Sequence, residues 1–217
     1  MGQATSQAAP VMELSSKEVL SRLQRRRKWW LRGAVALSLP FLPFIRGMAP
    51  MPVEHALRAA GMVLIVICIF GRAWCILYIG GRKTSELIDI GPYSVSRNPL
   101  YFFSFMGALG LGLQFGSVLM GLAFLGVAMT VFVPLVRREE GVLGAVFGET
   151  FRDYCNRVPR FLPRPSVWQD ARRVTFAPRL LYTTLRDGLV FVAGVVLLDL
   201  LQLWQVTAEV PILLRLI

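Results

Sequence analysis

The residues Gly91 to Tyr101, GPYSVSRNPLY, separate two long apolar runs of this chain. Proline disfavours helix at the residue before it, so Pro92 and Pro99 predict a shaped loop that ends where a new helix begins, with Pro99 in its first turn. The start of a helix offers backbone N–H groups that suit an anionic ligand. Tyr93 and Tyr101 add aromatic faces with polar tips. We therefore expect a ligand site at this junction.

The rest of the chain has the composition of a membrane protein. Hydrophobic residues make up 55% of its 217 residues, which excludes an ordinary soluble domain. Runs long enough to cross about 30 Å of hydrocarbon predict an all-α polytopic protein with about five transmembrane helices. The third run is short and almost continuous with the fourth, which predicts a tight helical hairpin, and the last could instead lie in the membrane interface. The five runs are approximately residues 29–45, 57–79, 100–115, 117–136 and 188–204.

These runs suggest a division of the chain. Residues 1–28 form a basic N-terminal segment, and residues 29–80 hold the first two spans. Residues 81–165 form the core that contains the loop, and residues 166–217 form a basic interfacial segment with the last span. The opening residues lack the basic start and small-residue cleavage site of a signal peptide, so we expect the first span to be retained.

The basic residues indicate an orientation. The net charge is +11, and arginine and lysine concentrate before the first span, between the second and third, and between the fourth and fifth. The positive-inside rule places these segments, and with them the candidate site, on the cytoplasmic side. We expect a bacterial inner membrane, or the endoplasmic reticulum in a eukaryote. No nucleic-acid motif accompanies the charge, so anionic lipid is the expected partner and nucleic acid is not.

A second set of motifs follows the fourth apolar run. It consists of Arg137-Arg138-Glu139-Glu140, then FGETFRDY at residues 147–154, then Val158-Pro159-Arg160. With the loop at residues 91–101, these blocks resemble the isoprenylcysteine carboxyl methyltransferase and phospholipid methyltransferase superfamily. The resemblance covers residues 78–163. The family loop carries histidine where this chain has Asn98.

The resemblance implies a helical membrane enzyme whose cofactor is S-adenosyl-L-methionine. It assigns Glu139, with Glu140 second, to the ammonium group of this methyl donor, and the backbone near Asn98 to its carboxylate. The segment 157–163 is expected to fold over the adenine. The cofactor-binding residues implied in this way are Tyr78, Ser85, Glu86, Leu87, Ile88, Tyr93, Asn98, Pro99, Leu100, Tyr101, Glu139 and Glu140.

The methyl acceptor would be a lipid or a lipidated molecule that arrives through the membrane. A prenylated cysteine carboxylate needs no general base but would bind an arginine, and Arg137, Arg138 and Arg72 are candidates. The family arginine for this contact aligns near Leu135. A phosphatidylethanolamine amine is the alternative acceptor, and it would have to lose a proton. Arg72 lies within an apolar run, so it either reaches the interface or lies near substrate.

Other classes remain open. Sterol reductases, which use a nicotinamide cofactor, share a similar loop, and a non-catalytic protein of the same fold would be consistent with Asn98. Glu139 and Glu140 could also be a solvated helix end paired with Arg137 and Arg138. We expect no metal site, because His55 stands alone and the three cysteines are expected to be free thiols. The sequence leaves the oligomeric state undetermined.

The predicted orientation can be tested with Cys155, which lies in the arginine-rich segment. In sealed, right-side-out vesicles, a membrane-impermeant thiol reagent should label Cys155 only after permeabilisation. Mass spectrometry of the labelled peptide measures this, with the denatured protein as the positive control. Labelling of intact vesicles would invert the topology and separate the candidate site from a cytoplasmic donor.

Overall fold

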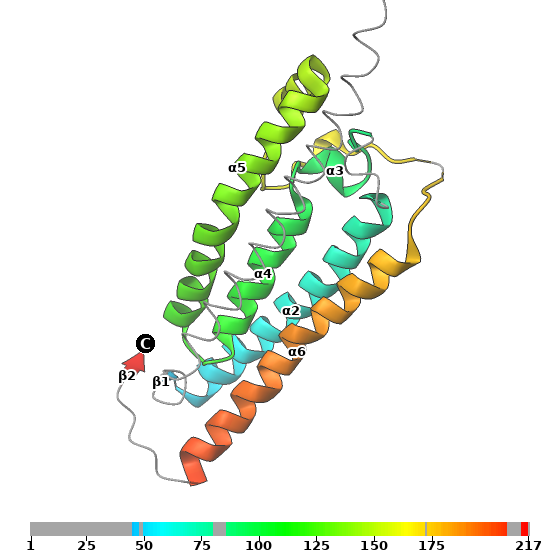
Figure 1. The fold of residues 1–217 in the computed structure, drawn as a ribbon. Helices are drawn as coiled ribbons and strands as arrows, with labels where there is room; N and C mark the ends of the chain where they lie inside the picture. The colour runs from blue at the N-terminus through cyan, green and yellow to red at the C-terminus, as the bar shows by residue number, and fades with distance from the viewer. Residues whose placement is uncertain (1–44, 48–49, 80–85, 172, 208–213, 217) are drawn as a thin grey trace, which may run out of the picture.

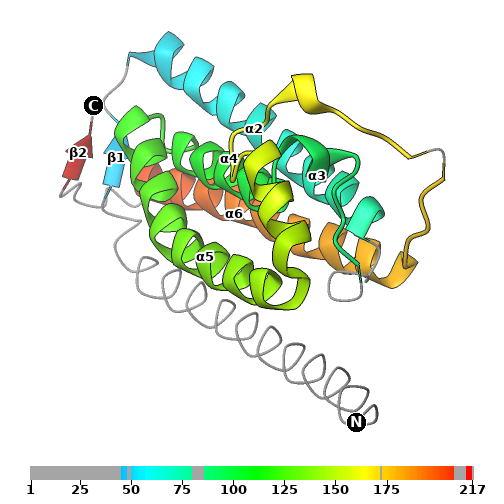
Figure 2. The same ribbon diagram turned by 90° about the horizontal axis from the view of Figure 1, so that it is seen from above.

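In a computed structural model, the described residues 45–47, 50–79, 86–171, 173–207 and 214–216 form a bundle of four long helices. They are α2 (Met51–Ile79), α4 (Pro99–Leu113), α5 (Val118–Arg157) and α6 (Pro178–Thr207). Helix α4 lies between α2 and α5, and α6 packs along α2 (Figures 1 and 2). The described part is thus helical, as predicted, apart from two short strands.

The two strands, β1 (Ile45–Gly47) and β2 (Leu214–Leu216), pair in parallel. The all-α expectation did not include this pairing. The basic segment 1–28 and nearly all of the first expected span lie outside the described residues.

Close packing of α2 on α4 depends on small residues at their interface. A Cβ atom added to Gly61 would overlap the carbonyl oxygen of Gly110, and one added to Gly107 would overlap the sulfur of Cys68. In lipid, where apolar surface alone gives helices little reason to associate, such close approach is a main source of helix–helix affinity. Helix α2 is also apolar enough to span a membrane, which agrees with the second predicted span, although it begins six residues earlier.

The predicted hairpin is formed by α4 and α5. Pro99 occupies the first turn of α4 with Asn98 as its N-cap, as the prolines predicted. Gly116 adopts a φ of 68° in the turn, and the Ser117 side chain accepts a hydrogen bond from the Met120 N–H at the start of α5. With 15 residues, α4 is about 22 Å long, which is too short to cross the hydrocarbon by itself.

Helix α5 corrects the prediction most clearly. The fourth run was expected to end near residue 136, but α5 runs for 40 residues from Val118 to Arg157, with a kink at Gly148, whose φ is 53°. Glu139 lies 21 residues after Val118, which corresponds to about 32 Å of helix. The glutamates therefore lie inside a continuous helix, at the depth where α5 would leave the membrane. They are not at a helix end.

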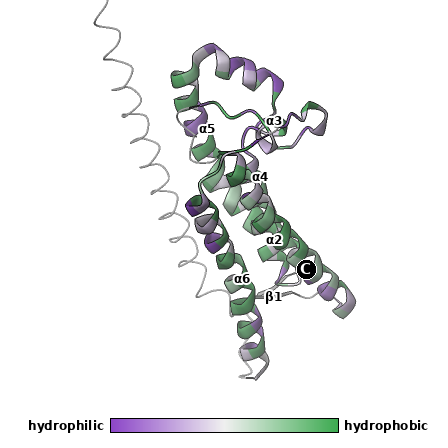
Figure 3. Ribbon diagram, turned by 90° about the vertical axis from the view of Figure 1, so that its right-hand side faces the viewer, coloured by the Kyte–Doolittle hydropathy of each residue, from purple (hydrophilic) through white to green (hydrophobic). Residues whose placement is uncertain are grey.

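Helix α6 also begins earlier than predicted, at Pro178, and is attached to α2 by polar contacts near its far end. Arg58 donates to Gln202 at 2.6 Å and forms an ion pair with Asp199. Three described helices, α2, α5 and α6, are long and apolar enough to cross a membrane, where the sequence predicted five spans over the whole chain. Figure 3 shows apolar residues along α2 and α4, with polar residues toward the end that carries α3 (Pro92–Val95).

The short helix α3 replaces part of the loop expected at residues 91–101. Gly91 precedes it with a φ of 58° and a ψ of −133°, a combination open essentially to glycine. A Cβ atom at this position would also overlap the Tyr78 ring. Gly91 thus lets the chain pass closely beneath the end of α2.

We predict that Gly91→Ala destabilises the protein by about 1–3 kcal/mol, because backbone strain and a steric clash add together. Thermal unfolding in detergent, followed by intrinsic fluorescence, measures the effect. Gly141→Ala is the matched control, because Gly141 is helical and a Cβ there meets no atom within 4 Å. The control should be neutral or stabilising by up to about 1 kcal/mol. Equal unfolding temperatures for the two variants would contradict the conformation assigned to Gly91.

Candidate functional site

Two adjacent buried carboxylates lie at the centre of the candidate site. Glu139 is 2% exposed and Glu140 is 8% exposed, which excludes the solvated helix end considered from the sequence. Burial of two carboxylates on one helix is costly unless each has hydrogen-bonding partners. Their partners therefore decide what the pair can do.

Glu140 holds three segments of the chain together. Its Oε1 atom accepts a hydrogen bond from Asn98 Nδ2 at 2.8 Å, and its Oε2 atom accepts one from Arg160 Nε at 2.9 Å. Arg97 Nε lies 3.4 Å from Oε1, in ion-pair rather than hydrogen-bond geometry. Two arginines thus balance one buried carboxylate. This ion-pair network joins the α4 N-terminus, α5 and the segment that follows α5.

These partners differ from those in the helix-end alternative, which paired the glutamates with Arg137 and Arg138. Arg137 and Arg138 precede the glutamates in sequence but have exposed side chains. They lie about 200° and 100° around the helix from Glu139. Arg97 and Arg160, which pair with Glu140 instead, were not singled out from the sequence, although both belong to the motif blocks. Charges next to each other along a helix point in different directions, so adjacency in sequence did not identify the partners.

Glu139 has a different environment. Its Oε1 atom accepts a hydrogen bond from the Tyr101 hydroxyl at 3.0 Å, and both side chains are buried. The Tyr101 ring packs against Phe132, with ring centroids 5.4 Å apart. A carboxylate that accepts a hydrogen bond from a phenol and lies beside aromatic rings can also bind a cationic ligand group.

The segment after α5 folds back over the loop at residues 91–98. The Arg97 N–H donates to Pro159 O at 2.9 Å, the Asn98 N–H donates to Arg160 O at 3.2 Å, and the Arg164 N–H donates to Val95 O at 2.9 Å. Residues 158–164 of this segment form neither helix nor strand. The backbone N–H of Asn98, one of several backbone donors expected near the donor's carboxylate, is thus bonded within the protein.

Two buried tyrosines, Tyr93 and Tyr154, connect the loop to α5. The Tyr154 hydroxyl donates to Tyr93 O at 2.7 Å. Burial raises the pKa of the Tyr93 phenol well above its ordinary value, with smaller contributions from the neighbouring Cys75, Tyr154, Glu139 and Tyr101. The phenol therefore stays neutral at physiological pH and can donate a hydrogen bond.

A further strap over this end of the bundle was not predicted. Ser94 Oγ accepts a hydrogen bond from the Gln169 N–H at 2.9 Å, and the Tyr78 hydroxyl donates to Asp170 Oδ1 at 2.9 Å. The Trp168 ring stacks on Trp74, with centroids 5.6 Å apart. Such contacts join residues far apart in sequence, so no local pattern could have revealed them.

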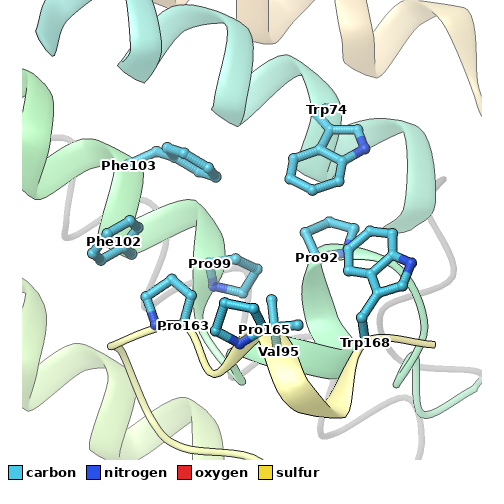
Figure 4. Close-up of a pocket in the computed structure, with 9 residues that line it drawn as sticks. All are labelled: Trp74, Pro92, Val95, Pro99, Phe102, Phe103, Pro163, Pro165 and Trp168. Carbon is cyan, nitrogen blue, oxygen red and sulfur yellow. The ribbon is translucent and has the colours of Figure 1, made fainter. Parts of the chain in front are cut away.

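An apolar groove of about 420 Å³ opens beside the loop. As Figure 4 shows, proline, phenylalanine and tryptophan rings surround it from α2, α3, α4, η2 (Pro165–Val167) and the residues that flank η2. None of the charged groups described above lines it. The lining residues are Trp74, Pro92, Val95, Pro99, Phe102, Phe103, Pro163, Pro165 and Trp168.

The remaining predicted residues have varied surroundings. Glu86 is exposed, and Leu87 packs against the cluster of Phe151, Tyr154 and Val158. Ile88 and Leu100 pack with Cys75, Ile79 and Tyr93. Ser85 lies outside the described residues. Within those residues, no group of three or more histidine, cysteine or acidic side chains could hold a metal ion.

Comparisons with known proteins identify relatives of this chain. Residues 57–150 match the phospholipid methyltransferase family. The nickel-cobalt-cadmium resistance protein NccN of Alcaligenes xylosoxydans xylosoxydans is 37% identical over 62% of this chain and 64% of its own length. The cobalt-zinc-cadmium resistance protein CzcN of Cupriavidus metallidurans is 39% identical over 54% of each chain.

A third relative is a named enzyme. The protein-S-isoprenylcysteine O-methyltransferase of Schizosaccharomyces pombe is 30% identical over 38% of this chain and 35% of its own length. The chain thus spans less than two thirds of the length of these curated relatives. No solved structure matches it.

The family match includes the 91–101 loop and both glutamates, and the similarity to the yeast enzyme points to the same group. Both findings are consistent with the isoprenylcysteine carboxyl methyltransferase and phospholipid methyltransferase superfamily, whose members include membrane methyltransferases.

Proposed function

We propose that this protein is a membrane methyltransferase that uses S-adenosyl-L-methionine to methylate a lipid-borne acceptor. The proposal rests chiefly on Glu139. Its side chain is only 2% exposed, and its carboxylate accepts a hydrogen bond from the Tyr101 hydroxyl. It lies about 32 Å along α5, where the helix would leave the hydrocarbon. A water-soluble cation and a membrane-borne acceptor could meet at such a depth.

The residues present fit this methyl donor. Its ammonium group matches the Glu139 carboxylate, and its sulfonium matches aromatic faces such as those of Tyr93 and Tyr101. When bound, the donor supplies an electrophilic methyl group. The protein needs no covalent intermediate, so its task is to hold two reactants in near-attack geometry and to exclude water. The return segment at residues 158–164 supports this task by closing over the loop.

The apolar groove suggests how an acceptor could be held. Phe102, Phe103 and Trp74 line it from the membrane-facing helices, so an acyl or prenyl chain could enter from the bilayer without crossing water. A carboxylate acceptor could react directly, whereas a protonated amine would first need a base. We infer a prenylcysteine-like or other lipid carboxylate, with a phosphatidylethanolamine-type amine as the alternative.

The distribution of arginines further supports a cytoplasmic site. The donor-binding carboxylate and the groove both lie at the α3 end of the bundle, with Arg97, Arg157 and Arg160. The positive-inside rule favours the cytoplasm for this end, where the donor would be available.

We predict that the purified protein binds S-adenosylmethionine and S-adenosylhomocysteine, and does not bind NADPH or NADH. Glu139 would attract the ammonium group of the first pair, whereas a dinucleotide phosphate would be repelled by a buried carboxylate. Calorimetry with the full chain in detergent or nanodiscs measures binding. Saturable NADPH binding without a response to S-adenosylhomocysteine would favour a reductase and exclude the methyltransferase. Binding of neither would favour a non-catalytic protein.

Changing Glu139 or Glu140 to glutamine should have different effects on donor binding and on stability. Glu139→Gln should weaken S-adenosylhomocysteine binding by about 1.5–3 kcal/mol, or roughly one to two decades, because a charged hydrogen bond is lost. Its unliganded unfolding temperature should hardly change, since glutamine can still accept from Tyr101.

Glu140→Gln is the matched control one residue away. It leaves Arg97 and Arg160 without their carboxylate, and we expect a loss of about 3 kcal/mol in stability. Calorimetry and thermal unfolding of both variants measure the contrast. Normal donor binding by the Glu139 variant would remove the role assigned to this residue.

A further inference from the structure

The arginines of this protein differ in whether the chain itself provides a partner for their charge. One set bonds to other side chains of the described residues: Arg58, Arg72, Arg97, Arg152, Arg157 and Arg160. Arg179 and Arg186, in the first turns of α6, have exposed side chains. Within the part of the chain that the structure describes, no hydrogen bond or ion pair engages either guanidinium. Their charge is therefore available to a partner outside the chain.

Both arginines lie on the side of α6 that points away from the bundle. The packed side of this helix is marked by Gly188, which faces Ile69 of α2, and by Val195, which is buried. Arg179 and Arg186 come nine residues before Gly188 and Val195, respectively. At 100° per residue, nine residues amount to two and a half turns, so each arginine lies opposite its packed counterpart.

Tyr182 and Leu189 complete this outward face. Tyr182 lies three residues after Arg179 and four before Arg186, spacings that make neighbours on a helix surface. It is 69% exposed, and Leu189, one turn further along, is 62% exposed. Exposed apolar side chains continue on the same side as far as Leu200. The face thus passes from two cations and a phenol to apolar surface, which is the order of polarity of a phospholipid from headgroup to acyl chain.

Arg186 lies at the depth expected for lipid headgroups. Helix α6 is long and apolar enough to cross a membrane. Counting about 20 residues of hydrocarbon back from its end at Thr207 reaches Gly188. Arg186 therefore falls just outside this boundary, and Arg179 lies about 10 Å further out. At these depths a guanidinium group reaches phosphates without entering the hydrocarbon.

Arg137 and Arg138 of α5 are exposed as well, but they do not form a comparable face. Successive residues point about 100° apart around a helix, so the two guanidinium groups do not share one side. No aromatic residue lies three or four positions from either of them. They provide the same charge without the arrangement found on α6, which makes them a matched comparison.

We propose that the outward face of α6 formed by Arg179, Tyr182 and Arg186 binds an anionic phospholipid of the surrounding membrane. A guanidinium fork matches a phosphate with two parallel hydrogen bonds, and the Tyr182 hydroxyl can donate a further one. Two unpaired cations favour a headgroup with net negative charge over a zwitterionic one, whose own cation they would repel. Leu189 would contact the start of an acyl chain.

This assignment is narrower than the general affinity for anionic lipid predicted from the basic segments. It selects arginines whose charge has no partner among the described residues and leaves out those that pair within the fold. The phospholipid would be a bound ligand and not a methyl acceptor. The inference therefore does not depend on the function proposed above, and either can fail without the other.

Native mass spectrometry of the full-length protein in neutral detergent tests the site. The protein is titrated separately with dioleoylphosphatidylglycerol and dioleoylphosphatidylcholine, which share their acyl chains and differ in headgroup charge. We expect the wild type to bind the first phosphatidylglycerol about tenfold more tightly. The double variant Arg179→Gln/Arg186→Gln should bind the two lipids about equally, because each arginine near an anionic lipid contributes about fivefold in affinity. Arg137→Gln/Arg138→Gln removes the same charge from α5 and should keep the wild-type preference.

Equal affinity of the wild type for the two lipids would overturn the inference. A preference that the α6 double variant retains, or that both double variants lose alike, would do so too. Displacement of the lipid by an equal concentration of sn-glycerol 3-phosphate would assign the site to free phosphate and not to a phospholipid. If the α6 double variant does not fold, Arg179→Gln and Arg186→Gln are tested singly. Each should lower the preference about fivefold, and an unchanged preference in both would equally contradict the proposal.

Discussion

The site end of this protein depends on one buried carboxylate and the charges that balance it. Glu140 receives hydrogen bonds from Asn98 and Arg160 and an ion pair from Arg97. A buried carboxylate without such partners would cost several kcal/mol. Because these partners come from the α4 N-terminus and from the segment after α5, satisfying this single charge fixes how the loop, the long helix and the return segment meet. The backbone bonds from Arg97 and Asn98 to the same segment then reinforce the arrangement.

The neighbouring glutamate does not take part in this network in the same way. Glu139 lies in the same helix but on another side, where Tyr101 donates to it. One carboxylate thus maintains the structure while the adjacent one lies among aromatic side chains suited to a cationic ligand. The groove lies at the same end of α4 and is lined by apolar rings.

The sequence predicted those features that local chemistry controls. Pro99 marked the start of α4, and the short run before Ser117 indicated the hairpin. The sequence did not predict that α5 continues beyond Val136, because charged residues after an apolar run resemble a helix end. The kink at Gly148 depends on a positive φ that a glycine permits but does not require. The partners of Glu140 are 20 to 43 residues away in sequence, and the strap at Gln169 and Asp170 bonds to residues still more distant. Tertiary packing decides such pairings. The motif blocks identified the residues of the site but not the contacts between them.

The proposed contact between Glu139 and the ammonium group of the methyl donor is tested most directly by a thermodynamic cycle. The wild type and Glu139→Gln would each be titrated with S-adenosylhomocysteine and with its analogue that lacks only the amino group. If the contact forms, the analogue should bind the wild type less tightly than S-adenosylhomocysteine does. This penalty should nearly disappear in Glu139→Gln, which corresponds to a coupling free energy of about 1.5–3 kcal/mol. Equal penalties in the two proteins, which give a coupling near zero, would contradict the assignment.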